Sequence, residues 1–223
     1  MKLLGCNWHA APYVMLARPG VERIEDLRGK SVAASSPGTP PDMVARAALV
    51  QAKVPPAEVK IAAVGGDRDR FTALIGGVVD AAVVSNEYLP LPSVKSLRVL
   101  VEARQVLPQF LRFCTLVTGK TLNDRREDLV RFMTAQIKAV RYAVTHRDET
   151  IALTREAIGA KPDDPRPAFV YEEGLTPGVV DADFSIPLES LVWSREQMIE
   201  LGRLAQGGAI KRLSYPDIRK AAL

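Results

Sequence analysis

Short apolar runs alternate with longer amphipathic segments in the first half of the chain. The runs at 31–34, 59–64 and 80–84 are short and almost continuously apolar, which predicts buried strands. After the first of them, Thr39 stands before two prolines, a residue order typical of a helix start, and the predicted helix continues to about residue 52. The pattern predicts a segment of alternating strands and helices.

Each of the three predicted strands ends in a turn of small polar residues. Asp67, in the second turn, can cap a helix whose apolar positions follow at helical spacing. Strands that alternate with helices in this way predict a parallel sheet with helices on both faces. The turns that follow parallel strands lie at one edge of the sheet, where helix amino termini offer unpaired N–H groups. We therefore expect the turns at 35–39, 65–67 and 85–88 to converge.

Convergence of these turns predicts a ligand site. The partly positive helix ends favour an anionic or strongly polar group, and the glycines let a ligand approach the backbone. Ordinary helix capping explains any one of these residues alone, so the site depends on their convergence. The predicted contacts in the turns are Ser35, Ser36, Gly38, Thr39, Gly66, Asp67, Ser85, Asn86, Glu87 and Tyr88.

Three stretches carry a resemblance to a known family. They are IEDLRGK at 24–30, the SSPGT turn at 35–39 and ALIGGVVDAA at 73–82. Together they resemble the solute-binding proteins of bacterial ABC importers, and the nitrate/sulfonate/taurine group in particular. That group shares a type II periplasmic-binding-protein fold with thiamine-pyrimidine-binding proteins. The resemblance covers essentially the whole chain, but its sharp motifs lie at 24–88.

The resemblance implies an α/β fold of two lobes joined by two crossover strands, at 3–16 and 111–118. Residues 17–110 would form a complete lobe of parallel-sheet β/α units that carries the ligand-facing turns. Residues 1–16 and 111–223 would form the crossover strands and the C-terminal part of an incomplete, helix-rich first lobe. The family's export signal and first strands are not in this chain, so we expect open strand edges and self-association as a dimer.

The second half of the chain looks mainly architectural. Apolar residues recur every three or four positions at Leu129, Met133, Ile137, Val140 and Val144, which predicts a long helix facing a core. Further helices are predicted at about 150–159, at 169–174 and at 188–206, the last of them ending at Gly207 and Gly208.

Composition narrows the class of protein. The chain is 47% hydrophobic and 25% charged, with a mean hydropathy of +0.01, and no apolar run is long enough to span a bilayer. The net charge is +4, but basic and acidic residues are interspersed, as at 125–128, which argues against nucleic-acid binding. The first six residues look like a lipoprotein cleavage site without the apolar stretch of a signal peptide. A periplasmic location is therefore implied only by the resemblance.

Few residues favour metal or cofactor chemistry. His9 and His146 are far apart and have no cysteine or carboxylate at metal-ligand spacing, so we expect no metal and no cofactor. Trp8 and His9 lie where the first crossover enters the cleft region, and either ligand contact or packing explains them. A tryptophan face stacks well on planar or cationic groups.

The remaining reactive side chains have competing interpretations. Cys6 and Cys114 fall one in each crossover strand, and we favour two buried free thiols over a disulfide. Arg68 or Arg70 could pair with a ligand carboxylate or sulfonate, although a solvated surface role is favoured. Asp80 begins a strand at the end opposite the turns, which predicts a structural role.

Three functions fit these observations. The first is a receptor that captures a small organic solute, anionic or aromatic, and presents it to a membrane permease. The second is an enzyme on the same fold, similar to pyrimidine-synthesising or aromatic-acid-decarboxylating proteins. The third is a ligand-sensing regulatory domain. We favour the receptor and expect no catalysis, because no cysteine-rich motif, His/carboxylate cluster or helix-turn-helix segment is found in the sequence.

Overall fold

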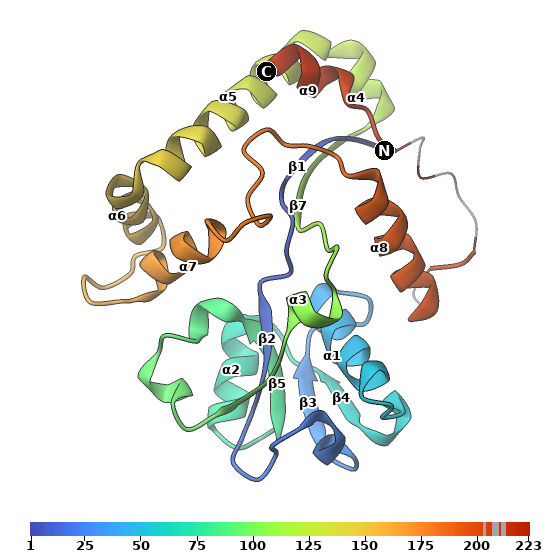
Figure 1. The fold of residues 1–223 in the computed structure, drawn as a ribbon, viewed down its shortest axis with the longest axis vertical. Helices are drawn as coiled ribbons and strands as arrows, with labels where there is room; N and C mark the ends of the chain where they lie inside the picture. Colours follow the sequence, from blue (N-terminus) through green and yellow to red (C-terminus); the bar gives the residue numbers. More distant parts are fainter. Residues whose placement is uncertain (203, 207–209, 211–212) are drawn as a thin grey trace. The chain divides into compact units, whose positions relative to one another are not determined.

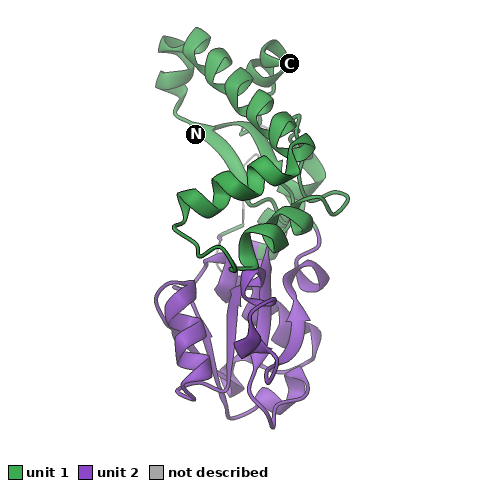
Figure 2. Cartoon of the chain, turned by 90° about the vertical axis from the view of Figure 1, so that its left-hand side faces the viewer, with its two compact units in different colours: residues 1–10, 109–197, 205–223 green, residues 11–108, 198–204 purple. Residues whose placement is uncertain are grey.

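The computed structural model describes residues 1–202, 204–206, 210 and 213–223. They divide into two compact units, drawn in different colours in Figure 2. Unit 1 takes in Met1–Ala10, Gln109–Gln197 and the described part of Ala205–Leu223, and unit 2 takes in Ala11–Pro108 and the described part of Met198–Leu204.

Unit 2 is built on a five-stranded mixed sheet of order β4-β3-β5-β2-β6 (Figure 1). Its strands are β2 (Tyr13–Ala17), β3 (Ser31–Ala34), β4 (Lys60–Ala63), β5 (Ala81–Ser85) and β6 (Arg98–Glu102). The parallel pairing of β3 with β4 and β5 confirms the predicted β/α segment. The sheet also contains antiparallel pairs, because β2 runs antiparallel to both β5 and β6. The first crossover strand expected at 3–16 includes the first four residues of β2, which lie within this sheet.

Two helices connect the parallel strands of unit 2. α1 (Pro40–Gln51) leads from β3 outward to β4, and α2 (Asp67–Ile75) leads back past β3 to β5. Because right-handed crossovers in opposite directions put their helices on opposite faces, α1 and α2 sandwich the sheet. The α2 side of the core contains Leu16, Ala82 and Val84, alternate residues of their strands, as the two-residue period of a strand requires.

At the starts of α1 and α2, the structure differs from the predicted helix caps. Thr39 precedes α1 as expected, but its hydroxyl donates to the Ser36 carbonyl at 2.6 Å and caps no helical N–H. Gly66, not Asp67, is the residue before α2, and the Asp69 carboxylate accepts the Gly66 N–H at 2.9 Å. The Asp67 carboxylate does not cap α2 and instead contacts Arg70 and Ser85. The other helical segments of unit 2 are η1 (Ile24–Leu27), η2 (Pro56–Glu58), η3 (Asn86–Tyr88), η4 (Pro92–Val94) and α3 (Ala103–Val106).

Unit 1 combines a two-stranded antiparallel ribbon with helices. β1 (Lys2–Trp8) pairs with β7 (Phe113–Val117). The helices are α4 (Gly119–Asp124), α5 (Arg126–Thr145), α6 (Arg147–Ala157), α7 (Arg166–Gly174), α8 (Leu188–Glu200) and α9 (Asp217–Ala222). The apolar stripe of α5 is confirmed: Leu129, Met133 and Ile137 are buried against Leu4 and Ile218. The helix predicted at 188–206 is shorter than expected, because α8 ends at Glu200 and its last three residues belong to unit 2. Gly207 and Gly208, its predicted end, lie outside the described residues.

The second edge of β1 is paired within the chain. Leu3 exchanges backbone hydrogen bonds with Leu213 and Tyr215, at 2.7 and 2.8 Å. Farther along, the Cys6 N–H donates to the Ser185 carbonyl and the His9 N–H donates to the Val179 carbonyl. Self-association of the chain stays a prediction, but the open edge expected to promote it is not present on β1.

Cys6 and Cys114 form a disulfide, so the preference for free thiols is wrong. The antiparallel register of β1 and β7 places the two residues directly opposite one another, with their Cα atoms 4.0 Å apart. Cys6 is fully buried. This pairing depends on a strand register between segments about a hundred residues apart, which the sequence pattern alone does not define.

No helix of the described residues has the length and apolar character that a membrane span requires.

Candidate functional site

The three predicted turns converge at one edge of the unit 2 sheet. β3 lies between β4 and β5, and all three run in the same direction, so their carboxyl ends are neighbours. Ala34 is paired with Ala63, and the Val64 N–H continues the ladder by donating to the Ala34 carbonyl at 2.8 Å. This edge, with the turns 35–39, 65–67 and 85–88, is called the strand-end site below.

A buried arginine ties two of these turns together. The Arg70 side chain donates from Nε to the Val83 carbonyl at 2.7 Å, and from its two terminal nitrogens to the Gly65 carbonyl at 2.7 Å and Asp67 Oδ1 at 2.6 Å. The same Asp67 oxygen accepts the Ser85 N–H at 2.9 Å. One guanidinium and one carboxylate thus hold the end of β5 against the turn after β4.

Arg70 is therefore neither a surface residue nor a candidate for ligand pairing, and both interpretations of it are corrected. The residue is 2% exposed, because α2 turns it toward β5 and away from solvent. Neighbouring Arg68 is exposed, and its guanidinium has no hydrogen-bond or ion-pair partner in the part of the chain that the structure describes. Arg68 is the cation that the strand-end site can offer to a ligand.

The first turn of α1, just after the turn 35–39, contains a carboxylate that the sequence analysis does not identify. Asp42, 1% exposed, accepts the Gly38 N–H at 2.8 Å and the Arg46 Nε–H at 2.8 Å. Gly38 has φ +82°, a conformation that side-chain-bearing residues rarely adopt, so glycine is needed there. An acidic residue in the first turn of a helix, just after a glycine turn, was the available sequence signal for Asp42.

The protein's own carboxylates accept some of the backbone N–H groups of the strand-end turns. The N–H groups of Gly38, Gly66 and Ser85 donate to Asp42, Asp69 and Asp67 respectively. The first two residues of α1 are prolines, which have no N–H at all. For an anionic ligand, this edge offers the hydroxyl groups of its turns and the Arg68 guanidinium.

The remaining predicted contacts differ in what they can offer. Ser35 and Ser36 have hydroxyls without a hydrogen-bond partner among the described residues, and both are at least partly exposed. Asn86 and Glu87 are half-buried at the start of η3. The Tyr88 ring is 7% exposed and stacks on Phe71 with ring centroids 4.4 Å apart, so its observed role is packing.

Trp8 and His9 belong to unit 1. His9 Nε2–H donates to the Cys6 carbonyl at 3.0 Å and lies 4.0 Å from the Asp181 carboxylate. The Trp8 ring meets Phe113 edge-to-face at 6.3 Å. Both side chains are half-buried and have packing partners within unit 1.

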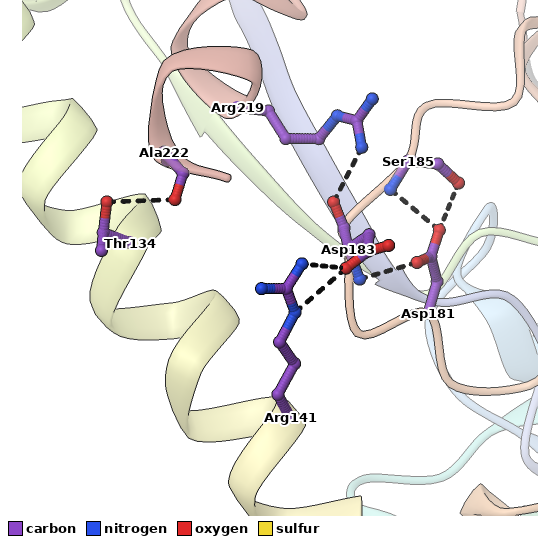
Figure 3. A network of polar contacts seen from close by, with 7 residues as sticks. All are labelled: Thr134, Arg141, Asp181, Asp183, Ser185, Arg219 and Ala222. Carbon is purple, nitrogen blue, oxygen red and sulfur yellow. Dashed lines mark hydrogen bonds and ion pairs between the residues drawn. The ribbon is translucent and has the colours of Figure 1, made fainter.

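A polar network organises the chain segment beside His9 (Figure 3). Asp181 accepts hydrogen bonds from the Asp183 N–H and from the N–H and hydroxyl of Ser185. Arg141 on α5 donates to the Asp183 carboxylate, and Arg219 donates to the Asp183 carbonyl at 2.9 Å. Burial raises the pKa of Asp181, but the hydrogen bonds and the nearby His9 outweigh it, so the pKa is lowered overall.

Asp80 lies at the opposite end of the sheet from the turns, as predicted. Its carboxylate accepts the N–H and the hydroxyl of Ser31, both at 2.8 Å, and so joins the starts of β3 and β5. Hydrogen bonding from the Ser31 N–H is the main cause of the lowered pKa of Asp80. Burial opposes that shift, and the Ser31 hydroxyl, Lys30 and Arg18 add to it.

The cavity of unit 2 lies away from the strand-end site. A cavity of about 460 Å³ in unit 2 is lined by α1, β6 and the segment 22–25, and not by the strand-end turns. In the described ranges, no three His, Cys, Asp or Glu side chains converge as metal ligands. Both cysteines of the chain are in the disulfide, so neither is a free thiol.

Comparison with known proteins identifies relatives. A family model described as NMT1/THI5 like matches residues 8–150. No curated protein is significantly similar in sequence. Among solved structures, the periplasmic aliphatic sulphonate binding protein SsuA from Escherichia coli matches with a TM-score of 0.75 at 18% identity, over 96% of this chain and 69% of that one.

Two further structures bear on the choice between receptor and enzyme. The alkanesulfonate-binding protein SsuA from Xanthomonas axonopodis pv. citri, bound to MOPS, matches with a TM-score of 0.73 at 14% identity, over 96% of this chain and 74% of that one. The desulfurization enzyme DSZB matches with a TM-score of 0.68 at 14% identity, over 99% of this chain and 78% of that one. These likenesses confirm the periplasmic-binding-protein-like α/β fold, which binding proteins and an enzyme share.

Proposed function

Because the chain belongs to the NMT1/THI5-like family, we propose that it is the substrate-binding component of an ABC-type importer. It captures a small organic solute and delivers it to a membrane permease. The observation that carries the proposal is the strand-end site, where three turns follow neighbouring parallel strands and the Arg70–Asp67 pair holds two of them together. Beside these turns, Ser35, Ser36 and Arg68 have side chains without a partner among the described residues. Ligands of open α/β sheets bind at such an edge.

We propose that the solute contacts hydroxyls and Arg68 at this edge. Ser35 and Ser36 supply donors and acceptors, Arg68 supplies charge, and Asn86 with Glu87 borders the site. Gly38, Thr39, Gly66, Asp67 and Ser85 shape the turns, and Trp8, His9 and Tyr88 stay predicted contacts. Because a guanidinium binds planar or tetrahedral oxyanions through two hydrogen bonds, Arg68 favours a carboxylate or sulfonate.

We also propose a binding role without catalysis. A cysteine nucleophile is not available while Cys6 and Cys114 are bonded to one another. The disulfide supports a periplasmic location, because disulfides persist in oxidising compartments. It does so independently of the resemblance to periplasmic proteins.

Calorimetric titration of the purified chain tests this proposal. Ethanesulfonate, benzoate and neutral benzamide serve as probes, and the mixtures are then analysed for products. Saturable binding of an anionic probe without turnover is the expected result, and Arg68→Gln should weaken it by about tenfold or more, as loss of a charge-assisted hydrogen bond predicts. Arg98→Gln is the matched control, because Arg98 is also exposed on unit 2 but lies on β6. Product formation, or anion affinity unchanged in Arg68→Gln, would contradict the proposal.

A further inference from the structure

The cavity of about 460 Å³ in unit 2 lies along β6, the last strand of the sheet. Residues 98–101 of β6 all line it, together with the segment 22–25, the end of α1 and part of α3. All of these residues belong to unit 2, so the cavity is complete within one compact body.

The cavity extends around the outer edge of β6. Met15 and Leu16 are successive residues of β2, so their side chains point to opposite faces of the sheet. Val101 lies opposite Met15, and Val99 lies opposite Leu16. Because paired residues share a face, the two valines also lie on opposite faces. Both line the same cavity, and β2 covers the inner edge of the strand, so the cavity runs along the outer edge. It is called the β6 groove below.

The outer edge of β6 offers backbone groups to another chain. In the part of the chain that the structure describes, no backbone hydrogen bond reaches residues 98–101 from the side away from β2. Leu100 is also the extra residue of a β-bulge and has no partner on β2. A row of unpaired N–H and C=O groups along a strand is a template for a further extended segment.

The β6 groove also has apolar surface on which side chains of such a segment can pack. Val99 is 42% exposed although it belongs to a strand of the core sheet. Ile24 and Val106, which face the same space from η1 and α3, are half-buried. An extended chain beside β6 would cover part of these three side chains.

One charge of the β6 groove is available to a ligand. Arg98 lies 3.7 Å from the Glu22 carboxylate, so these two charges neutralise one another. Arg23 is likewise used, since its Nε lies 3.4 Å from the Asp26 carboxylate. Glu25 is exposed and has no ion-pair partner among the described residues. The groove is therefore complementary to a cation.

We propose that the β6 groove binds a short extended peptide segment with a basic side chain, which adds to the sheet as a strand beside β6. In strand addition, main-chain hydrogen bonds supply affinity and alternate side chains supply specificity. Four lining residues of β6 at about 3.3 Å each span about 13 Å, so about four residues of the segment pair with the strand. The proposal is independent of the importer role and of the strand-end site.

Two features of β6 explain why the edge selects a short segment. The bulge at Leu100 interrupts the regular ladder, and the strand begins and ends with the charged residues Arg98 and Glu102. Bulges and charges are devices by which proteins keep an edge strand from pairing without limit. Continuous stacking of copies of this chain along β6 is therefore disfavoured.

Capped tetrapeptides test the proposal by NMR. The basic probe is Ac-Thr-Val-Lys-Val-NH₂, and Ac-Thr-Val-Glu-Val-NH₂ is its acidic counterpart. A third probe repeats the basic sequence with N-methyl groups on the valine and lysine amides, which keeps the side chains but removes backbone donors. In a ¹H–¹⁵N spectrum of the full chain, the basic probe should shift the amide signals of residues 98–101 in a saturable way. The acidic probe should bind about threefold or more weakly, and the methylated probe about tenfold or more weakly.

Two pairs of variants separate the charge from the strand edge. Glu25→Gln should weaken the basic probe about two- to fivefold, whereas Glu58→Gln should not, because Glu58 is an exposed carboxylate of unit 2 outside the groove. Val99→Lys should weaken the basic probe about fivefold or more, because a lysine on an edge strand opposes pairing. Val78→Lys adds the same charge elsewhere on unit 2, at a residue that is 77% exposed, and should leave binding unchanged.

Several results would overturn the inference. One is the absence of saturable shifts at residues 98–101 up to millimolar concentration of the basic probe. A methylated probe that binds as tightly as its parent would exclude backbone pairing. Shifts confined to unit 1 or to the strand-end turns would place the peptide elsewhere. Shifts of the same amides with protein concentration alone would assign the edge to a second copy of the chain. The methylated probe and Glu25→Gln keep the test valid even if Val99→Lys does not fold.

Discussion

Each unit fastens a loop with an arginine and an aspartate, but the two pairs differ in burial and in reach. In unit 2, the Arg70 side chain is 3% exposed and bonds to groups from the end of β5 and from the turn after β4. In unit 1, the Arg141 side chain is 47% exposed, and among the described residues it bonds only to Asp183, itself 57% exposed. Water reaches both partners of the second pair, whereas in the first pair it reaches Asp67, 36% exposed, but not Arg70. We therefore expect the Arg70–Asp67 pair to contribute substantially to the stability of unit 2, and the Arg141–Asp183 pair to contribute little to that of unit 1.

The strongest test removes the buried arginine. Arg70→Met should lower the free energy of unfolding by about 3–5 kcal/mol, because three hydrogen bonds of a charged group are lost and the Val83 carbonyl is left without a donor in a buried place. Chemical denaturation measures this loss. Arg68→Met, two residues earlier on the same helix but exposed, should change stability by less than about 0.5 kcal/mol. Equal effects of the two variants would show that burial does not distinguish them.

The next test concerns the covalent link of unit 1. The disulfide joins residues 108 positions apart and closes a loop that includes most of unit 2. Replacing both Cys6 and Cys114 by alanine should cost about 2–4 kcal/mol, since the unfolded chain regains the freedom of that loop. Denaturation with and without a reducing agent measures it. The denaturation curve of the double variant should be the same with and without the reductant. A wild-type curve that is also unchanged by the reductant would contradict the expected stabilisation by the disulfide.

Asp80 gives unit 2 a weaker anchor whose contribution depends on pH. Its pKa is lowered in the folded state, mainly by the Ser31 N–H, so its contribution is complete above the unfolded value near 3.8 and is lost as the pH falls through the lower folded value. Asp80→Asn should cost about 1–2 kcal/mol at neutral pH. The difference between wild type and variant should shrink below pH 4. A difference that stays constant down to pH 2 would contradict an ionised Asp80 as its source.

The local patterns of unit 2 were predictable because their causes are close in sequence. Alternating apolar runs and glycine-rich turns define β3, β4, β5 and the strand-end site within 24–88. The antiparallel placement of β2 could not be predicted in the same way, since it depends on where a distant strand, β6, comes to lie. The role of Arg70 could not be predicted for a related reason. Two of its partners are backbone carbonyls, and residue types in the sequence do not show which carbonyls an arginine will meet.

Unit 1 shows the same limit more strongly. The apolar stripe of α5 could be predicted from the spacing of its own residues, and the buried residues of the helix lie on that stripe. The Cys6–Cys114 pairing and the contacts of β1 with 213–215 depend on a register between segments at the two ends of the unit. Single-chain periodicity holds no information on such a register, so the disulfide and the closed edge of β1 could only be seen in three dimensions.

The smallest effect should come from the exposed pair of unit 1. Arg141→Gln removes the charge that meets Asp183 but leaves a side chain able to donate one hydrogen bond. Because both partners are about half exposed and solvent screens their charges, we expect a loss of at most about 0.5–1 kcal/mol, falling further in high salt. Denaturation at low and high salt measures it, with Arg141→Lys as the charge-preserving control. A loss as large as that of Arg70→Met would mean that Arg141 acts through the whole network of Figure 3, including the Asp181 segment beside His9, and not through one exposed ion pair.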